Sequence, residues 1–290
     1  MYLVRILSRL PFWFLYPLAE ATAFFGYHIL GYRREVVREN LTTAFPDKSN
    51  AELRRTTKAF YRQLSQVFVE SIMAYRFTHM DWVKRVPLVN KEEVLAYLDQ
   101  GVPVILMSGH VANWEWPALS IGAQMGYPME FLYKPVTKEK FENIMLKLRT
   151  KHGGIAIAKD SAMREIIKRR KQPRLVGIIG DQLPSMGTEK LWFDFLNRET
   201  AFYVGAERIA TLTQYAVFYT DTKRTGLGKY EVTFRKIASP TYEKGHSGVI
   251  QRYKELLQET IHQHPSDYLW SHRRWKYTKA QDEVRSTSKA

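Results

Sequence analysis

An apolar run over residues 102–107 is the feature that most constrains the fold of this 290-residue chain. Its length and composition predict a strand that is buried on both faces. The run ends at Ser108-Gly109, where glycine lets the chain turn sharply because it tolerates positive φ. His110 follows, and Asn113 is the predicted N-cap of the next helix. A strand, a glycine turn, a histidine and a helix start indicate an open α/β sheet, which carries its chemistry at the carboxyl ends of strands.

The chain beyond this stretch alternates between apolar strand-like runs and helices with a 3.6-residue period. The predicted strands cover residues 129–133, 155–158, 175–180, 215–219 and 230–234. The predicted helices cover residues 35–45, 51–75 (with Asn50 as the cap), 91–100, 138–151, 161–171, 202–213 and 248–262. Residues 187–200 are predicted to form a loop or hairpin. This pattern predicts an α/β domain over residues 35–280, with a central mixed, largely parallel sheet flanked by helices, and a disordered tail over 281–290.

The most apolar segment lies near the N-terminus, over residues 10–32, and is interrupted by charge only at Glu20. Its length suffices to cross a bilayer, since a spanning helix needs about 20 residues. Aromatic residues are spread along it, and arginines lie on both sides, as suits a segment near lipid headgroups. We therefore predict an uncleaved membrane-anchoring helix over residues 1–34, either spanning or lying on the membrane.

The net charge is +15, from 44 Lys and Arg against 29 Asp and Glu, and predicts an anionic partner. Nucleic acid, anionic lipid and acidic protein all qualify. The basic clusters are scattered among amphipathic segments and match no nucleic-acid motif, so nucleic acid is disfavoured. The absence of cysteine excludes thiolate metal sites and cysteine nucleophiles.

Polar residues follow three of the predicted strands. His110 and Glu115 follow the first; they can face each other only if His110 lies in the turn and Glu115 in the first helical turn. The alternative is a buried histidine bonded to backbone and a glutamate that complements the helix dipole. Lys134 follows a second strand, and Asp181-Gln182 a third. If these strands are parallel, their ends bring the His, Glu, Lys and Asp together at one edge.

Several other chemistries lack their motifs. Ser108 is not set in the G-x-S-x-G elbow of a serine nucleophile. His262 and His264 have no third ligand at metal spacing, and no phosphate-binding glycine loop occurs, so we predict no metal and no cofactor. A histidine–carboxylate pair without a covalent nucleophile suits direct attack by a bound hydroxyl, with the histidine as general base.

The stretch His110-Val-Ala-Asn-Trp-Glu115 resembles the H-x4-[DE] motif of glycerolipid-type acyltransferases. The full set of motifs, in order over about residues 1–277, is similar to the bacterial lipid A biosynthesis (lauroyl/myristoyl) acyltransferase family. The motifs are Arg38-Glu-Asn-Leu with Ala44-Phe-Pro46, Gly109-His-Val-Ala-Asn-Trp-Glu115, Tyr133-Lys-Pro135, Gly180-Asp-Gln182 with Gly187 and Phe193, and Tyr268-Leu-Trp-Ser-His-Arg-Arg-Trp-Lys276.

The resemblance implies a glycerolipid acyltransferase-like fold at the inner (cytoplasmic) membrane, with the active site facing the cytoplasm. It also implies transfer of a fatty acyl chain, typically from acyl carrier protein and otherwise from acyl-CoA, to a hydroxyl of a lipid A-type acceptor. His110 would take the hydroxyl proton, and Glu115 would orient the imidazole. The basic charge agrees with an anionic membrane surface and with an acidic carrier protein.

The family commonly has an arginine where this chain has Lys134, so Arg149 is a second candidate for the partner of the oxyanion. Asp181 corresponds to an acidic family residue, which we interpret as a site organiser. Arg273 and Arg274 are candidates to hold acceptor phosphates, or else to form structural ion pairs.

Asn113 and Gln182 complete the candidate substrate-binding or oxyanion residues. The alternatives are the same chemistry on another glycolipid or aminolipid, and a basic membrane-binding protein without catalysis.

Overall fold

A six-stranded sheet forms the centre of the molecule. The computed structural model describes residues 8–133, 146–151, 153–158, 161–242 and 248–287. The sheet has the order β3-β2-β4-β1-β7-β8. The strands are β1 (Val104–Ser108), β2 (Met129–Tyr133), β3 (Gly154–Ala158), β4 (Leu175–Ile179), β7 (Ala216–Gly226) and β8 (Lys229–Ala238). All neighbouring pairs are parallel except β7 with β8, so the predicted mixed, largely parallel sheet is confirmed.

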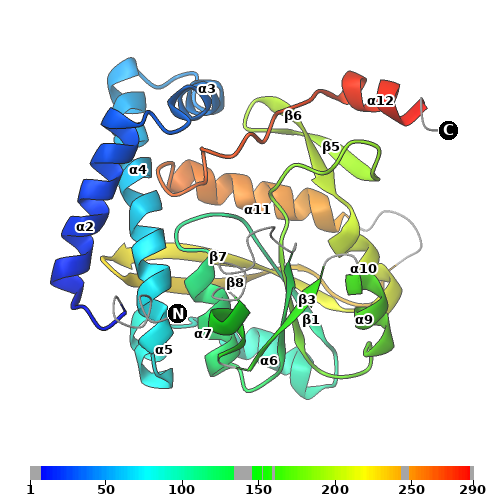
Figure 1. The fold of residues 1–290 in the computed structure, drawn as a ribbon. Coiled ribbons are helices and arrows are strands. Elements are labelled where there is room, and N and C mark those ends of the chain that lie inside the picture. Colours follow the sequence, from blue (N-terminus) through cyan, green and yellow to red (C-terminus); the bar gives the residue numbers. More distant parts are fainter. Residues whose placement is uncertain (1–7, 134–145, 152, 159–160, 243–247, 288–290) are drawn as a thin grey trace.

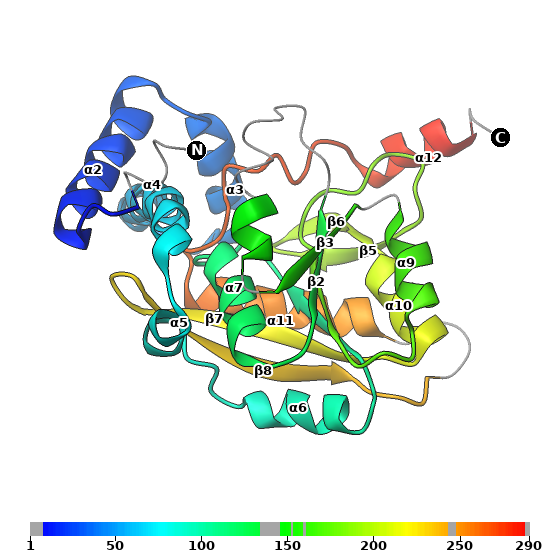
Figure 2. The same ribbon diagram turned by 60° about the horizontal axis from the view of Figure 1, so that its bottom comes forward.

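Helices cover both faces of the sheet (Figures 1 and 2). Neighbouring residues of a strand point to opposite faces. On β7, Phe218 packs edge-to-face against Tyr97 of α6 (Lys91–Asp99), whereas Tyr219 packs against Tyr253 of α11 (Val249–Gln263). β1 is therefore enclosed, and its residues 104–107 are fully buried, which explains the unbroken apolar run.

The remaining helices follow the predicted pattern closely. They are α3 (Arg34–Ala44), α4 (Asn50–Met73), η2 (Ala74–Arg76), α5 (His79–Arg85), α7 (Glu115–Gln124), α9 (Ala162–Lys168) and α10 (Gly205–Thr213). The cap of α4 is Ser49, which forms a capping box with Glu52, and not the predicted Asn50. The short helix α5 was not predicted. Of the predicted helix over 138–151, residues 146–150 are helical and 138–145 lie outside the described residues.

The N-terminal helices α2 (Phe12–Phe24) and η1 (Phe25–Ile29) lie along α4 (Figure 1). Buried α2 residues join the main core, so the described part of the predicted anchor packs against the α/β domain. The outer face is apolar and exposed. It consists of Trp13, Phe14, Leu18, Phe24, Phe25, Ile29 and Leu30. Within the ranges that the structure describes, no helix has both the length and the apolar character needed to cross a bilayer.

The predicted hairpin contacts the C-terminal tail. β5 (Lys190–Phe195) and β6 (Arg198–Tyr203) pair as an antiparallel hairpin. Its two turn residues both have positive φ, as a type I′ turn requires. The prediction of disorder over 281–290 is wrong for residues 281–287, because α12 (Lys279–Thr287) is anchored by Asp282, 2.6 Å from the ammonium of Lys190.

Candidate active site

Two neighbouring parallel strands bring His110 and Asp181 together. In the register of β1 and β4, Ser108 lies opposite Ile179, and each functional residue stands two positions further on. Asp181 Oδ1 lies 2.7 Å from His110 Nδ1, and Asp181 Oδ2 accepts the backbone N–H of His110 at 2.9 Å. The predicted convergence of strand ends is therefore confirmed for these two residues.

The charges of this pair depend on each other. Burial alone lowers the pKa of His110, but the Asp181 carboxylate outweighs burial and raises that pKa above its ordinary value. Burial likewise opposes ionisation of Asp181, but His110 holds the pKa of the carboxyl below its ordinary value. Because an ionised carboxylate only accepts, Nδ1 of a neutral His110 carries the proton. Nε2 then has a free lone pair, as a general base needs.

Glu115 does not orient the imidazole, contrary to the sequence-based expectation. Its carboxylate forms a bidentate ion pair with Arg149, from Nε to Oε2 at 3.0 Å and from Nη2 to Oε1 at 2.5 Å. The contact that orients His110 belongs instead to Asp181. Sequence spacing could not distinguish these pairings, because Asp181 and Arg149 are both distant in the chain. Lys134, the other cation predicted here, lies outside the described residues.

The loop between β1 and α7 depends on a glycine, a left-handed residue and a capping asparagine. We expected Gly109 to adopt positive φ, but it does not. A Cβ there would lie 2.5 Å from Leu257 Cδ1, so a larger residue would force the buried Leu257 side chain to shift. The left-handed residue is Ala112, with φ 51°. The residue at the N-cap of α7 is Trp114 and not the predicted Asn113, but Asn113 still caps the helix, since its Oδ1 accepts the N–H groups of Glu115 at 3.1 Å and Trp116 at 3.0 Å.

The segment around the last sequence motif, residues 268–276, forms backbone hydrogen bonds with the loop between β1 and α7. Leu269 donates its N–H to the carbonyl of His110 at 3.0 Å, and Ala112 donates to the carbonyl of Asp267 at 2.8 Å. The predicted phosphate contact is wrong for Arg274. Its side chain is 1% exposed, donates to the Ala201 carbonyl, and is therefore beyond the reach of a ligand at the surface. Arg273 is exposed.

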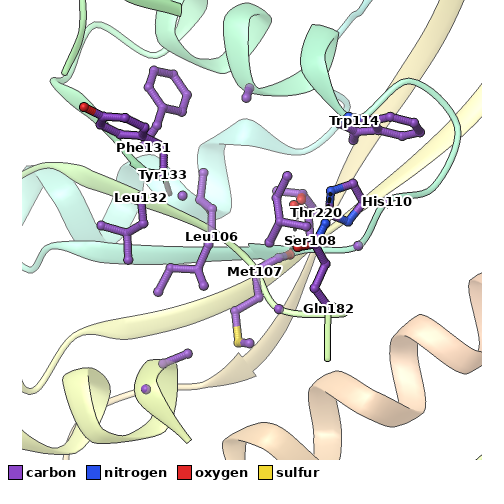
Figure 3. A pocket seen from close by; sticks show the side chains of 18 of the residues that line it. Leu106, Met107, Ser108, His110, Trp114, Phe131, Leu132, Tyr133, Gln182 and Thr220 are labelled. Carbon is purple, nitrogen blue, oxygen red and sulfur yellow. Dashed lines mark hydrogen bonds between the residues drawn. The ribbon is translucent and has the colours of Figure 1, made fainter. Parts of the chain in front are cut away.

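A cavity of about 620 Å³ opens beside the histidine. In Figure 3, His110, Trp114 and Gln182 lie on one side of the view, and Phe131 and Leu132 lie on the other. Glu115 and Arg149 also contribute to the lining. The remaining walls are largely apolar, and include Ile121, Met129, Met163, Ala206 and Ile209. The volume is that of a typical small-ligand site. Sequence analysis missed this cavity because its walls come from strands and helices throughout the domain.

Gln182 lies next to Nε2 of His110. Its Nε2 is 3.4 Å from His110 Nε2, so the amide N–H faces the lone pair that a substrate hydroxyl would use. Trp114 packs edge-to-face against the imidazole, with ring centroids 5.2 Å apart. The described residues contain no cluster of three or more His, Asp or Glu side chains that could hold a metal ion.

Sequence analysis also missed Glu70 on α4. It is completely buried, and its carboxylate accepts hydrogen bonds from Tyr16, Asn113 and Tyr230. The sequence could have indicated its burial, because Glu70 lies three residues after the buried Val67 and so on the same face of the helix.

Residues 1–277 match the family model described as bacterial lipid A biosynthesis acyltransferase. No curated protein matches the chain.

Proposed function

The chain belongs to the bacterial lipid A biosynthesis acyltransferase family, and from this premise we propose a specific reaction and site. The enzyme moves a fatty acyl chain from the thioester of an acyl carrier protein to a hydroxyl group of a lipid A-type acceptor. The observation that carries this proposal is the His110–Asp181 pair, which leaves Nε2 of His110 unprotonated in the wall of a largely apolar cavity.

His110 acts as the general base. Its Nε2 takes the proton of the acceptor hydroxyl while the hydroxyl oxygen attacks the thioester carbonyl carbon. The tetrahedral intermediate then collapses, the carbon–sulfur bond breaks, and the imidazolium returns the proton to the leaving thiolate. Asp181 stabilises the imidazolium formed between these steps, as the carboxylate of a catalytic triad does. The acceptor hydroxyl displaces the amide of Gln182 from Nε2.

Arg149 supplies positive charge to the developing oxyanion, and Glu115 holds its guanidinium in place. The bidentate pair fixes the fork at the wall of the cavity, where a preorganised donor acts most strongly. Lys134 is the alternative oxyanion partner, and exposed Arg273 is a candidate contact for acceptor phosphates. Asn113 supports Glu115 through the helix cap and does not touch substrate.

The apolar part of the cavity receives the acyl chain. Phe131, Met163 and Ile209 offer an apolar wall to the methylene groups, each of which gains about 0.8 kcal/mol on burial. The carbonyl end of the chain then lies next to His110 and Arg149.

The enzyme acts on the cytoplasmic surface of the inner membrane. The exposed outer face of α2 and η1, rich in aromatic residues, is suited to the headgroup region, and Arg33 and Arg34 follow it directly. Monotopic insertion of this face agrees with the absence of a spanning helix among the described residues. It brings a lipid acceptor to the level of the catalytic domain.

A direct assay tests this function. Purified protein is mixed with acyl carrier proteins that carry several chain lengths and with lipid A precursors in detergent or vesicles. We expect acylated acceptor from the wild type and none above background from His110→Ala. Full transfer by His110→Ala would overturn the mechanism, and an inactive wild type would favour the non-catalytic alternative. Mass spectrometry of lipids from a deletion strain separates a lipid A-type acceptor from another glycolipid or an aminolipid.

A further inference from the structure

The buried carboxylate of Glu70 joins three parts of the molecule that are far apart in sequence. Its Oε2 accepts hydrogen bonds from Asn113 Nδ2 at 2.8 Å and from the Tyr230 hydroxyl at 2.6 Å. Its Oε1 accepts the Tyr16 hydroxyl at 2.9 Å. Asn113 belongs to the loop between β1 and α7 that carries His110 (residues 109–114, the catalytic loop). Tyr230 belongs to β8, and Tyr16 belongs to α2. The backbone carbonyl of Glu70 also accepts the indole N–H of Trp116 at 2.9 Å.

Asn113 links Glu70 to the start of α7. Its Oδ1 caps α7 by accepting two backbone N–H groups, including that of Glu115. The cap works only if Oδ1 faces the helix, so Nδ2 must face away and needs a buried acceptor. Glu70 is that acceptor. The carboxylate thus fixes the orientation of the amide, the first turn of α7 and the position of Glu115.

Tyr16 extends the same network to the N-terminal helix. It lies on the inner side of α2, whereas Trp13, Phe14 and Leu18 are exposed on the outer side. The hydroxyl of Tyr16 is the direct polar contact from α2 to Glu70. A shift of α2 against α4 therefore acts on the carboxylate that holds Asn113.

We infer that Glu70 is a positioning residue for acyl transfer, which orients the catalytic loop through Asn113 and ties it to the membrane-facing helix α2 through Tyr16. This inference rests on the proposed function, because it assigns Glu70 a role in the reaction at His110. Arg224 provides the positive charge next to the carboxylate, because its Nη2 lies 3.9 Å from Glu70 Oε1. Arg224 also donates to Gln63 and Gln66.

A charge swap tests the contact between Glu70 and Asn113. Asn113→Asp alone places two carboxyl groups against each other at a buried 2.8 Å contact. We expect kcat to fall about tenfold or more, with KM for the acyl carrier protein within about threefold. In Glu70→Gln/Asn113→Asp the new amide donates to the new carboxylate, which still caps α7, so kcat should return to within about threefold of the wild type.

The outcomes of the swap are distinct. Glu70→Gln alone keeps an acceptor toward Asn113 but turns an NH₂ toward Tyr16, so its kcat should fall by less than that of Asn113→Asp. Rescue by the double variant, with melting temperatures close to that of the wild type, supports positioning. A double variant as slow as Asn113→Asp would overturn it. Absence of transfer by the wild type with every donor and acceptor would instead overturn the proposed function.

Tyr16→Phe tests the link to α2. We expect vesicles of phosphatidylglycerol and phosphatidylethanolamine to raise kcat of the wild type. Tyr16→Phe should bind these vesicles as the wild type does, but should lose at least about half of that increase. Tyr215→Phe is the matched control, because it removes a buried tyrosine hydroxyl that is bonded to Arg174 and not to Glu70. Equal vesicle stimulation in Tyr16→Phe and the wild type would overturn the link.

Discussion

Asp181 holds His110 at two points, through the ring at 2.7 Å and through the backbone N–H at 2.9 Å. The two contacts fix both the rotation of the imidazole and the position of the residue that carries it. Glu115 and Arg149 form a second, separate pair beside the first. The site therefore holds a base with an unprotonated Nε2 and a fixed cation, each with its own carboxylate.

The first prediction concerns Asp181→Asn. The substitution keeps the shape but removes the charge that stabilises the imidazolium, and an amide NH₂ facing Nδ1 favours the tautomer with Nε2 protonated. We expect kcat to fall roughly 10²- to 10⁴-fold, measured as single-turnover transfer from acyl carrier protein.

Asp221→Asn is the matched control for this loss. Asp221 pairs with Arg235 at 3.5 Å, away from the imidazole, and the variant should keep activity within about threefold of wild type. If Asp181→Asn retained wild-type kcat, Asp181 would have no part in the reaction.

The second prediction concerns pH. The Asp181 carboxylate raises the pKa of His110 above 6.5 despite the opposing effect of burial, and the base must be neutral to act. The rate should therefore rise with pH, with an inflection above 6.5. In Asp181→Asn burial is no longer outweighed by the negative charge, so the inflection should move to lower pH while the plateau falls.

A profile of kcat/KM between pH 5 and pH 9 measures this shift. Because the pH 5 end tests folding as well as protonation, circular dichroism over the same range serves as the control. An inflection that stays in place in Asp181→Asn would show that another group titrates.

The third prediction concerns the pair of Glu115 and Arg149. Loss of an oxyanion donor typically costs about 10²- to 10³-fold in kcat, and we expect this from Arg149→Ala. Glu115→Ala should cost less, because the guanidinium stays near the site. The double variant should be no slower than Arg149→Ala, since Glu115 acts through Arg149.

A double-mutant cycle in kcat checks this dependence. Arg149→Lys is the conservative control, and it should not restore the wild-type rate because an ammonium lacks the bidentate fork. Losses that simply multiply in the double variant would indicate that Glu115 acts independently of Arg149.

Much of the fold was predictable because each buried strand is a short apolar run with its own local signal. The run at Val104–Met107 identified β1, and the Gly180-Asp181-Gln182 turn identified the end of β4. Parallel strands then had to bring His110 and Asp181 to one edge.

The partners within the site were not predictable in the same way. Glu115 is near His110 in sequence, but its partner Arg149 comes from a helix next to β3. Glu70 showed only as an acidic residue in a helical apolar phase, and its three partners come from separate elements. Such pairings depend on tertiary packing, which the periodicity of a single segment does not reveal.

The fourth prediction concerns the outer face of α2 and η1. Burial of a large apolar side chain gains about 1.5 kcal/mol or more, so Trp13→Ser/Phe25→Ser should weaken binding to vesicles by about a hundredfold or more. Sedimentation with phosphatidylglycerol vesicles measures this. Leu212→Ser, at a side chain that is 65% exposed on α10, is the matched control and should bind as the wild type does. Unchanged binding of the double variant would place the membrane-binding face elsewhere.

The fifth prediction concerns the cavity. Ala206 lies on α10 and contributes a methyl group to the cavity wall. Phenylalanine at this position fills part of the space, so Ala206→Phe should prefer a shorter acyl chain. Each methylene that no longer fits costs about 0.8 kcal/mol, or roughly fourfold in kcat/KM, and the longest donors should lose most. Competition between acyl carrier proteins of different chain length measures the preference. His110→Gln should slow all donors to the same extent, which separates loss of chemistry from loss of fit, and an unchanged preference in Ala206→Phe would show that the chain binds elsewhere.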